Sequence, residues 1–152
     1  MHGFVSHFTN KVDAKGRVSI PAQFRQVLAR DGYEGVYCFP SPSNATIDAG
    51  GNALLSEIGK QLEGVDGMTA EYDLLAAAFY GESDTLRLEA EGRVILPETF
   101  REYTGITNSA LLVGLGHKFQ IWEPSRYAVH REAAKKTAYA RLTGRSAEVD
   151  SG

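Results

Sequence analysis

The sequence predicts a β-rich α+β fold in which two tandem copies of one unit pack about a pseudo-twofold axis as a barrel with flanking helices. Three observations support this prediction. Residues 8–28 align without a gap to residues 84–104, and eight of the 21 positions are identical. Glycine is abundant, at 16 of 152 residues, which favours turns over long helices. The segments between the turns are short and alternate apolar with polar residues, as half-buried strands do.

The identical positions of the two copies fall on residue types with strong local roles. They are Thr9/Thr85, Ala14/Ala90, Gly16/Gly92, Arg17/Arg93, Val18/Val94, Pro21/Pro97, Phe24/Phe100 and Arg25/Arg101. One unit of four short strands buries too little apolar surface to be stable alone, whereas two copies could share one core. We therefore expect a first repeat over residues 1–66, a linking helix with the second repeat over 67–142, and a flexible tail over 143–152.

Each copy begins with a predicted β-hairpin that leads into a helix. Strands over residues 8–12 and 18–20 flank residues 13–16, which have aspartate first and glycine fourth, as type I turns do. Pro21 ends the second strand and suits the first position of a helix, which Gly32 ends. The second copy has the same predicted elements: strands over 85–88 and 94–96, a turn over 89–92, and a helix from Pro97 to Gly105.

The remainder of each copy is predicted as two further strands and a helix. In the first copy these are 35–39, 45–47 and 51–62, and in the second copy 110–113, 118–122 and 125–142. Residues 70–80 are predicted to form the helix that links the copies, and residues 64–67 are the least structured connection. Residues 114–116 contain two glycines but lack the full dinucleotide-binding fingerprint, so a hairpin turn is predicted there.

The composition excludes a membrane-spanning protein and disfavours a secreted one. The longest uncharged runs, 74–80 and 110–115, fall well short of the roughly 18 residues that span a bilayer. The N-terminal residues 1–7 have no basic start followed by an apolar stretch, so no secretory signal is predicted. Cys38 is the only cysteine and is expected to be an inert buried thiol, and the four histidines are scattered. We expect no metal, no cofactor and a cytoplasmic location.

The charge is unevenly distributed along the chain. The net charge is −3, which alone argues mildly against a nucleic-acid partner. Residues 1–30, however, carry five cations against one anion, and residues 31–152 carry eleven against eighteen. A basic segment on an acidic body can bind a polyanion, because the electrostatic field at the contacting face, and not the net charge, determines the attraction. A solvated surface is the alternative interpretation of the same five cations.

A few residues of the two hairpins are candidates for function, and others are explained by the turns themselves. Gly16 and Gly92 are required by the turns, and Asp13 is expected to cap its own turn. The residues that invite a functional interpretation are Lys11, Lys15, Arg17 and Arg93.

The motif Asp-Ala-Lys-Gly-Arg-Val-Ser-Ile-Pro at 13–21, its partial echo at 89–97 and the closing Phe-Gln-Ile-Trp at 119–122 resemble the MraZ family. These are bacterial DNA-binding regulators associated with the cell-division and cell-wall gene cluster. The resemblance runs from Phe4 to about Tyr139. The first motif alone would indicate only the broader AbrB-like group of swapped-hairpin transcription factors and antitoxins.

The resemblance implies a swapped-hairpin fold, protomers joined in a homo-oligomeric ring, and binding of the ring to short direct repeats in promoter DNA, in the nucleoid. It assigns DNA contact to the Asp-x-x-Gly-Arg motif, and so to Lys15 and Arg17. A two-stranded β-ribbon fits the major groove, and an arginine can hydrogen-bond O6 and N7 of guanine together. Lys11 and Lys15 would neutralise phosphates.

The second copy departs from this motif. Glu89 stands in place of Asp13, and Glu91 in place of Lys15, while Arg93 is retained. A glutamate at the turn repels phosphate, so either Arg93 makes a weaker, supporting contact with DNA or this hairpin serves assembly and core formation. Of the two, we expect the supporting contact.

Three other functions remain open at the level of sequence. An AbrB-like antitoxin would bind a toxin, although such proteins usually carry one copy and a disordered tail. A structural ring-forming protein would assemble without reading DNA. An enzyme is not expected, because no nucleophile–base pair, phosphate loop or metal cluster is recognisable. The basic segment 125–142 is interpreted either as a second DNA contact or as a solvated helix face.

Overall fold

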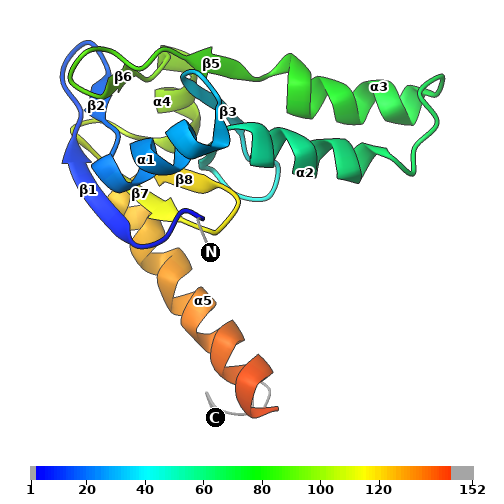
Figure 1. Ribbon diagram of the computed structural model, residues 1–152. Helices are drawn as coiled ribbons and strands as arrows, with labels where there is room; N and C mark the ends of the chain where they lie inside the picture. Colours follow the sequence, from blue (N-terminus) through cyan, green and yellow to red (C-terminus); the bar gives the residue numbers. More distant parts are fainter. Residues whose placement is uncertain (1–2, 145–152) are drawn as a thin grey trace.

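The computed structural model describes residues 3–144 and has an α+β fold rich in antiparallel strands (Figure 1). The elements in chain order are β1 (His7–Lys11), β2 (Arg17–Ser19), α1 (Ala22–Asp31), β3 (Val36–Pro40), β4 (Ile47–Gly50), α2 (Asn52–Leu62), α3 (Ala70–Ala76), the π-helical turn η1 (Ala77–Gly81), β5 (Asp84–Leu86), β6 (Arg93–Ile95), α4 (Glu98–Thr104), β7 (Ser109–Gly114), β8 (Phe119–Trp122) and α5 (Pro124–Thr143). The elements predicted from the sequence are therefore present, with bounds shifted by a few residues.

The strands form an open six-stranded sheet and a separate two-stranded ribbon. The sheet order is β1-β7-β8-β4-β3-β5, and the ribbon consists of β2 and β6. The predicted α+β, strand-rich class is confirmed, but the described strands form no closed barrel, because the edge strands β1 and β5 do not pair with each other. Instead the chain leaves each edge through a tight turn and enters the ribbon. The ribbon packs against the core through Val18 and Val94.

The strand pairing joins the two copies. β1 of the first copy pairs with β7 of the second, and β5 of the second copy pairs with β3 of the first. β2 pairs with β6 in the ribbon. The predicted turn exists, since Gly16 N–H donates to the Asp13 carbonyl at 2.9 Å, but the strands on either side of it do not pair with each other. The expected pairing within each hairpin is wrong because each strand finds its partner in the other copy.

The ribbon has equivalent contacts from both copies. Val18 and Val94, which correspond in the repeat, lie opposite each other. Ile20 N–H donates to Gly92 O and Leu96 N–H donates to Gly16 O, both at 2.9 Å. The ribbon therefore has a local twofold relation centred on the valine pair.

The main core lies between the sheet, the ribbon and the helices α1 and α4. From the ribbon it contains Val18 and Val94, and from the helices Phe24 and Phe100, all buried. Phe24 packs against Phe119 of β8 with ring centroids 4.9 Å apart. The identical phenylalanines and valines of the two copies are thus explained by packing alone.

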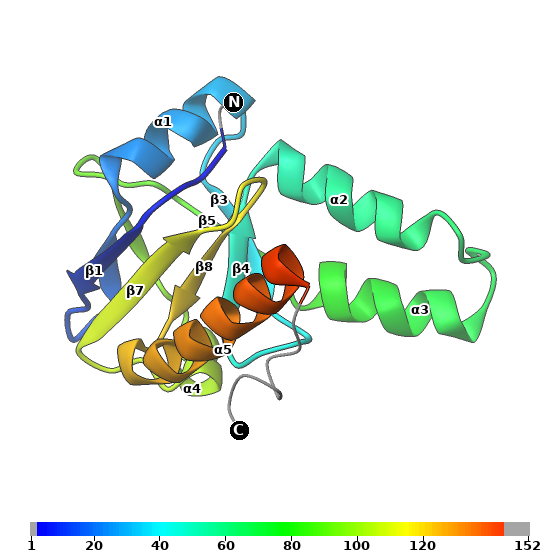
Figure 2. The same ribbon diagram turned by 90° about the horizontal axis from the view of Figure 1, so that it is seen from below.

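Two long elements project from this body (Figures 1 and 2). The helices α2 and α3 with η1 form an arm. The inner side of this arm is packed with apolar side chains, among them the buried Leu54, Ile58 and Leu62 of α2. The second projection is α5.

In the described residues no helix is long and apolar enough to cross a membrane. The predicted tail begins at Thr143, the last residue of α5, and Gly144 is the C-cap of that helix. The rest of the predicted tail, 145–152, lies outside the described residues. The division into repeats at residues 66 and 67 remains a prediction.

Candidate nucleic-acid interface

The β2–β6 ribbon presents both arginines of the repeated motif on its outer face. Side chains alternate along each strand, so Val18 and Val94 point into the core. In the antiparallel register Arg17 lies opposite Ile95, and Ser19 lies opposite Arg93. These four residues therefore share the outer face, and Arg17 and Arg93 are diagonal neighbours on it. The sequence predicts a separate hairpin in each copy, whereas the structure brings both arginines onto one ribbon.

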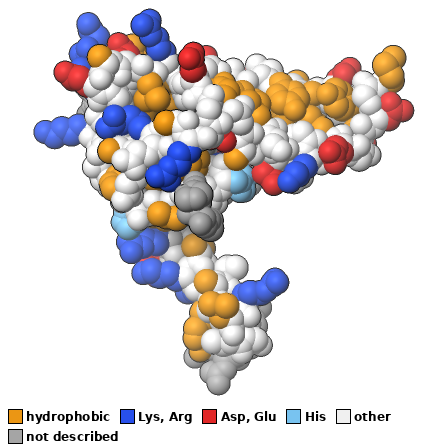
Figure 3. All heavy atoms as spheres, viewed as in Figure 1, with side chains coloured by type: hydrophobic (Ala, Val, Ile, Leu, Met, Phe, Trp, Pro, Cys, Tyr) orange, Lys and Arg blue, Asp and Glu red, His pale blue; other side chains and the backbone are white. Residues whose placement is uncertain are grey.

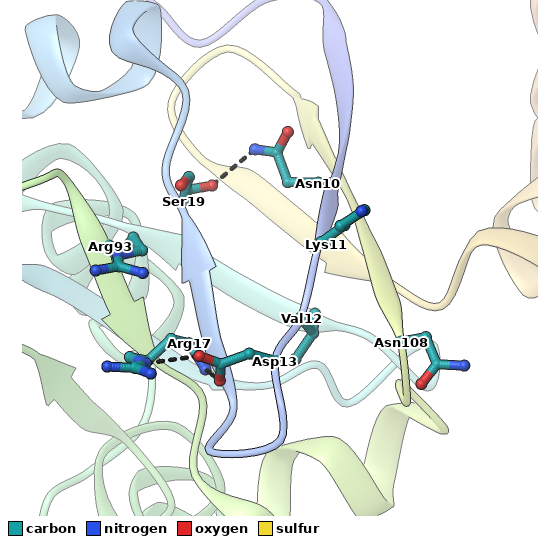
Figure 4. A pocket seen from close by; sticks show the side chains of 8 residues that line it. All are labelled: Asn10, Lys11, Val12, Asp13, Arg17, Ser19, Arg93 and Asn108. Atoms are coloured by element: carbon teal, nitrogen blue, oxygen red, sulfur yellow. Dashed lines mark hydrogen bonds and ion pairs between the residues drawn. The ribbon is translucent and has the colours of Figure 1, made fainter.

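Asp13 fixes the position of the Arg17 side chain (Figure 4). Its Oδ2 accepts a hydrogen bond from Arg17 Nε at 2.6 Å, and its Oδ1 accepts from the backbone N–H groups of Lys15 and Arg17, each at 2.9 Å. The carboxylate therefore closes the turn and also holds the guanidinium through Nε. Among the described residues no protein atom bonds the two terminal nitrogens of Arg17, so they remain available to a ligand.

The same contacts keep the Asp13 carboxylate ionised. They lower the pKa of Asp13 from 3.8 to about 2, and the first cause is the hydrogen bond from the Arg17 backbone N–H, followed by that from the Arg17 side chain. Hydrogen bonds to the charged form of an acid favour that form. The Asp13 side chain thus accepts backbone N–H groups of its own turn, and its bond to the guanidinium was not predicted from the sequence.

Arg93 has a different partner. The backbone of its turn matches the first copy, since Gly92 N–H donates to Glu89 O and Glu89 N–H to Arg93 O, both at 2.8 Å. Its Nη2, however, lies 3.0 Å from Oε2 of Glu91. In the second copy the carboxylate is thus paired with a terminal nitrogen of the arginine. In the first copy the carboxylate of Asp13 instead bonds Nε of Arg17. Arg93 is less available than Arg17 for bonding to an anion or a base.

An open recess of about 550 Å³ lies between the ribbon and β1. The predicted cations Lys11, Arg17 and Arg93 all line it, and Lys15 does not. The full lining comes from both copies and consists of Asn10, Lys11, Val12, Asp13, Arg17, Ser19, Arg93 and Asn108. Lys15 is exposed at the turn itself. The structure therefore brings Lys11, Arg17 and Arg93 together around one surface, with Lys15 at the adjacent tip of the turn.

Two asparagines of this recess were not identified from the sequence. Asn10 Nδ2 donates to Ser19 O at 2.8 Å and so ties β1 to the ribbon. Asn108 accepts the Val12 N–H through its backbone carbonyl at 2.9 Å, and its side chain is exposed. Asparagine side chains can bond adenine, but neither residue belongs to the repeated motif that directed the sequence prediction.

Each turn glycine is packed against an arginine of the other copy. Gly16 has φ +87°, and a Cβ there would lie 2.8 Å from Leu96 O and 3.0 Å from Arg101 Nε. At Gly92, with φ +76°, a Cβ would lie 2.6 Å from Arg25 Nε. Both arginines also donate Nε to a backbone carbonyl of their own copy at 3.1 Å. Arg25 and Arg101 thus support the turns, a role that their identity in the two copies could have indicated.

The histidine, cysteine and tryptophan side chains of the described residues lie outside this surface. The described residues contain no group of three or more histidine, cysteine or acidic side chains that could hold a metal. Cys38 is fully buried, and desolvation raises the pKa of its thiol far above the usual range, which fits the expected inert thiol. Trp122 is buried and stacks on His130 with ring centroids 4.5 Å apart.

Comparison with known proteins identifies the family. The family model described as "MraZ protein, putative antitoxin-like" matches residues 79–145. A protein named "Transcriptional regulator MraZ" from Methylocella silvestris is 53% identical over 135 residues, covering 89% of this chain and 82% of that protein. The chain belongs to the MraZ family. Proteins of the same name from Beijerinckia indica and Rickettsia canadensis are 51% and 37% identical, and the latter alignment covers 97% of this chain and 99% of the relative.

Membership of the MraZ family confirms the resemblance stated from the hairpin motif. The match with the Rickettsia canadensis relative covers 97% of this chain and so includes the Arg17 turn as well as the Arg93 turn. The family model itself covers the second copy.

Proposed function

We propose that this MraZ family member is a sequence-specific, DNA-binding transcriptional regulator that reads promoter DNA with the outer face of the β2–β6 ribbon. The relatives are named transcriptional regulators, which supports this class of function. The observation that carries the proposal is the position of Arg17, which is held at Nε by Asp13 with both terminal nitrogens unbonded by the described residues.

The ribbon is two-stranded and carries two arginines on its outer face, which are features of a major-groove reader. A two-stranded ribbon fits the major groove of B-DNA, and a guanidinium fork bonds guanine O6 and N7 together. Asp13 restricts the guanidinium before binding, so less side-chain entropy is lost when the base contact forms. Arg17 is therefore assigned to base reading and Arg93 to a weaker contact, since Glu91 competes for it.

The lysines are assigned to the phosphate backbone. Lys11 leads into the turn on β1 and Lys15 lies at its tip, and both are exposed. Lysine neutralises phosphate as a point charge, which contributes affinity without reading sequence. The basic first segment provides this field, although the net charge of the chain is −3.

One ribbon makes few base contacts, so several ribbons must act together for tight binding. We propose that protomers join in a homo-oligomeric ring that binds short direct repeats upstream of the cell-division and cell-wall gene cluster, in the nucleoid of the cytoplasm. Identical ribbons at fixed spacing suit direct repeats, and linked contacts raise the overall affinity through effective concentration.

Arg17→Ala is the decisive test. The loss of one bidentate base contact is about 1–3 kcal/mol, or roughly five- to 150-fold in affinity per ribbon. Band-shift or anisotropy titration with the DNA upstream of the chain's own gene should show this loss, and Arg93→Ala should show a smaller one. Circular dichroism checks that each variant is folded.

Lys15→Ala is the matched control, because it removes one charge from the same turn. We expect it to weaken binding to specific and unrelated DNA equally and to reduce the salt slope by about one ion. Arg17→Ala should instead reduce the preference for the promoter. Unchanged promoter affinity and salt slope in Arg17→Ala would show that the ribbon is not the reading surface.

An antitoxin role is the second candidate, because the matching family model carries the words "putative antitoxin-like". The second copy occupies the place of the toxin-wrapping tail that such proteins usually have. Co-purification of a small toxic partner with the tagged chain, together with absent promoter binding, would favour this role over the first.

A further inference from the structure

We propose that α5 of one protomer docks on the α2–α3 arm of a second copy, and that opposite charges on the two projections guide this contact. The inference deepens the proposed assembly by naming its surfaces. It does not depend on the proposed reading of DNA, and it is tested without DNA below.

Within the described part of the chain, the helix α5 has no partner along most of its length. Only its first turns contact the body, where Tyr127 and His130 pack on Trp122 and Arg126 Nη1 donates to Thr104 O at 2.9 Å. None of its 20 residues is buried. In proteins most of the stability of a helix comes from tertiary packing of one of its faces, so α5 would gain stability from a surface to pack against.

One face of α5 combines positive charge with apolar side chains. Arg131, Lys135, Tyr139 and Leu142 follow each other at i, i+4, i+8 and i+11, which places them along a single face of a helix. Leu142 is 85% exposed and Tyr139 45%. The helix as a whole has five cations against one anion (Figure 3). Such a face fits a surface that is acidic with exposed apolar residues.

The arm has that complementary character. Residues 52–82 have six anions against one cation, and the acidic side chains are spread over α2, α3 and the turn between them (Figure 3). Leu74 is 75% exposed on α3 and Met68 is 94% exposed beside it. The inner side of the arm is already filled by the contacts between α2 and α3, so its free surface is the outer one.

The partner must be another molecule. The arm and α5 leave the body in different directions in Figure 1, and among the described residues no ion pair joins them. The ion pairs within these two elements are local ones, Lys60 with Glu57 and Lys135 with Glu132. A second copy supplies the missing surface for each projection, and because the two surfaces differ, repeated contacts run head to tail.

Charge reversal tests this contact. One variant carries Arg131→Glu and Lys135→Glu on α5, and the other carries Glu63→Lys and Glu71→Lys on the arm. Native mass spectrometry without DNA should find the wild-type chain as an oligomer and each variant alone at a lower mass. An equimolar mixture should recover the wild-type stoichiometry, because each reversed surface then meets a complementary one. The wild-type oligomer should also weaken as salt rises.

The controls separate this proposal from the proposed function. Lys136→Glu makes the same change as Lys135→Glu on another side of α5 and should leave the stoichiometry unchanged, and melting curves check that each variant is folded. Arg17→Ala should weaken promoter binding while it leaves assembly intact. Full assembly of both reversed variants, or a monomeric wild type, would overturn the docking proposal. Normal assembly with reduced DNA affinity in the α5 variant would show that α5 contacts DNA instead.

Discussion

Two carboxylates bond the two arginines of the ribbon in different ways. Asp13 bonds Nε of Arg17 and leaves the terminal nitrogens unbonded by the described residues, whereas Glu91 pairs with a terminal nitrogen of Arg93. Both pairs are about one-third exposed at the arginine, so their energies are screened by solvent and their effect is mainly on orientation. The two copies share the arginine but differ in the carboxylate beside it, and this carboxylate determines how available the terminal nitrogens of each arginine are.

The pKa of Asp13 provides a measure of this orientation. The folded value is lowered to about 2 from 3.8, so Asp13 stabilises the folded turn fully above pH 3.8 and loses this effect as the pH falls through 2. Arg17→Ala should raise the pKa only part of the way to 3.8, because the first cause is the backbone N–H of residue 17, which remains. Carbon-detected NMR titration of the carboxyl group measures both values. A wild-type midpoint at the ordinary value would contradict the geometry.

Glu91→Lys should strengthen DNA binding by the ribbon. The change frees Nη2 of Arg93 and places a lysine where the first copy has Lys15. We expect a higher promoter affinity and a salt slope steeper by about one to two ions per ribbon. Glu34→Lys makes the same charge change in the loop between α1 and β3 and is the control. Equal effects of both variants would show that only the overall charge matters.

At the scale of elements, the ribbon depends on turns that exclude side chains. Gly16 has a positive φ and lies beneath Leu96 and Arg101 of the other copy. The turn therefore couples the outer face of the ribbon, which we propose reads DNA, to the packing between copies. Damage to the turn should appear in stability as well as in DNA binding.

Gly16→Ala should destabilise the protein, whereas Gly59→Ala should not. A left-handed alanine costs about 1–2 kcal/mol, and contact with the Leu96 carbonyl adds to it. Gly59 lies inside α2, and a Cβ added there would have nothing within 4 Å, so alanine should stabilise by up to about 1 kcal/mol. Thermal melting should show a loss of several degrees for the first variant and a small gain for the second. Similar melting temperatures would contradict the packing at Gly16.

At the scale of the whole molecule, the repeat predicted the elements but not their partners. Turn residues, prolines and alternating strands are local signals, so the bounds of the strands and helices could be predicted closely. The pairing of β1 with β7 could not, because nothing in residues 8–20 distinguishes a strand that pairs with its neighbour from one that pairs with the other copy.

The candidate site shows the same division between local and distant information. Lys11, Lys15, Arg17 and Arg93 were found from the repeated motif, which is local. Their gathering around one recess, and the addition of Asn108 from a distant segment, depends on the pairing across copies. The opposite charges of the arm and α5 are visible in the sequence, but the fact that both project from the body is not.

The pairing also predicts that neither half of the chain folds as a monomer. Within residues 1–66 only β3 and β4 pair with each other in the described part, and within the described part of 67–152 only β7 and β8 do. The remaining ladders, β1–β7, β2–β6, β3–β5 and β4–β8, all join the two halves. Each half alone would expose the main core and unpaired backbone groups, at a cost that a two-stranded unit cannot offset.

Circular dichroism and analytical ultracentrifugation of the separate halves test this prediction. We expect residues 1–66 and 67–152 each to lack a cooperative melting transition as monomers, and an equimolar mixture to regain the sheet signal and the melting transition of the intact chain. A half that folds cooperatively as a monomer would show that its strands can pair locally. The two copies would then be independent domains, and the placement of Arg17 and Arg93 on one ribbon would no longer follow from the fold.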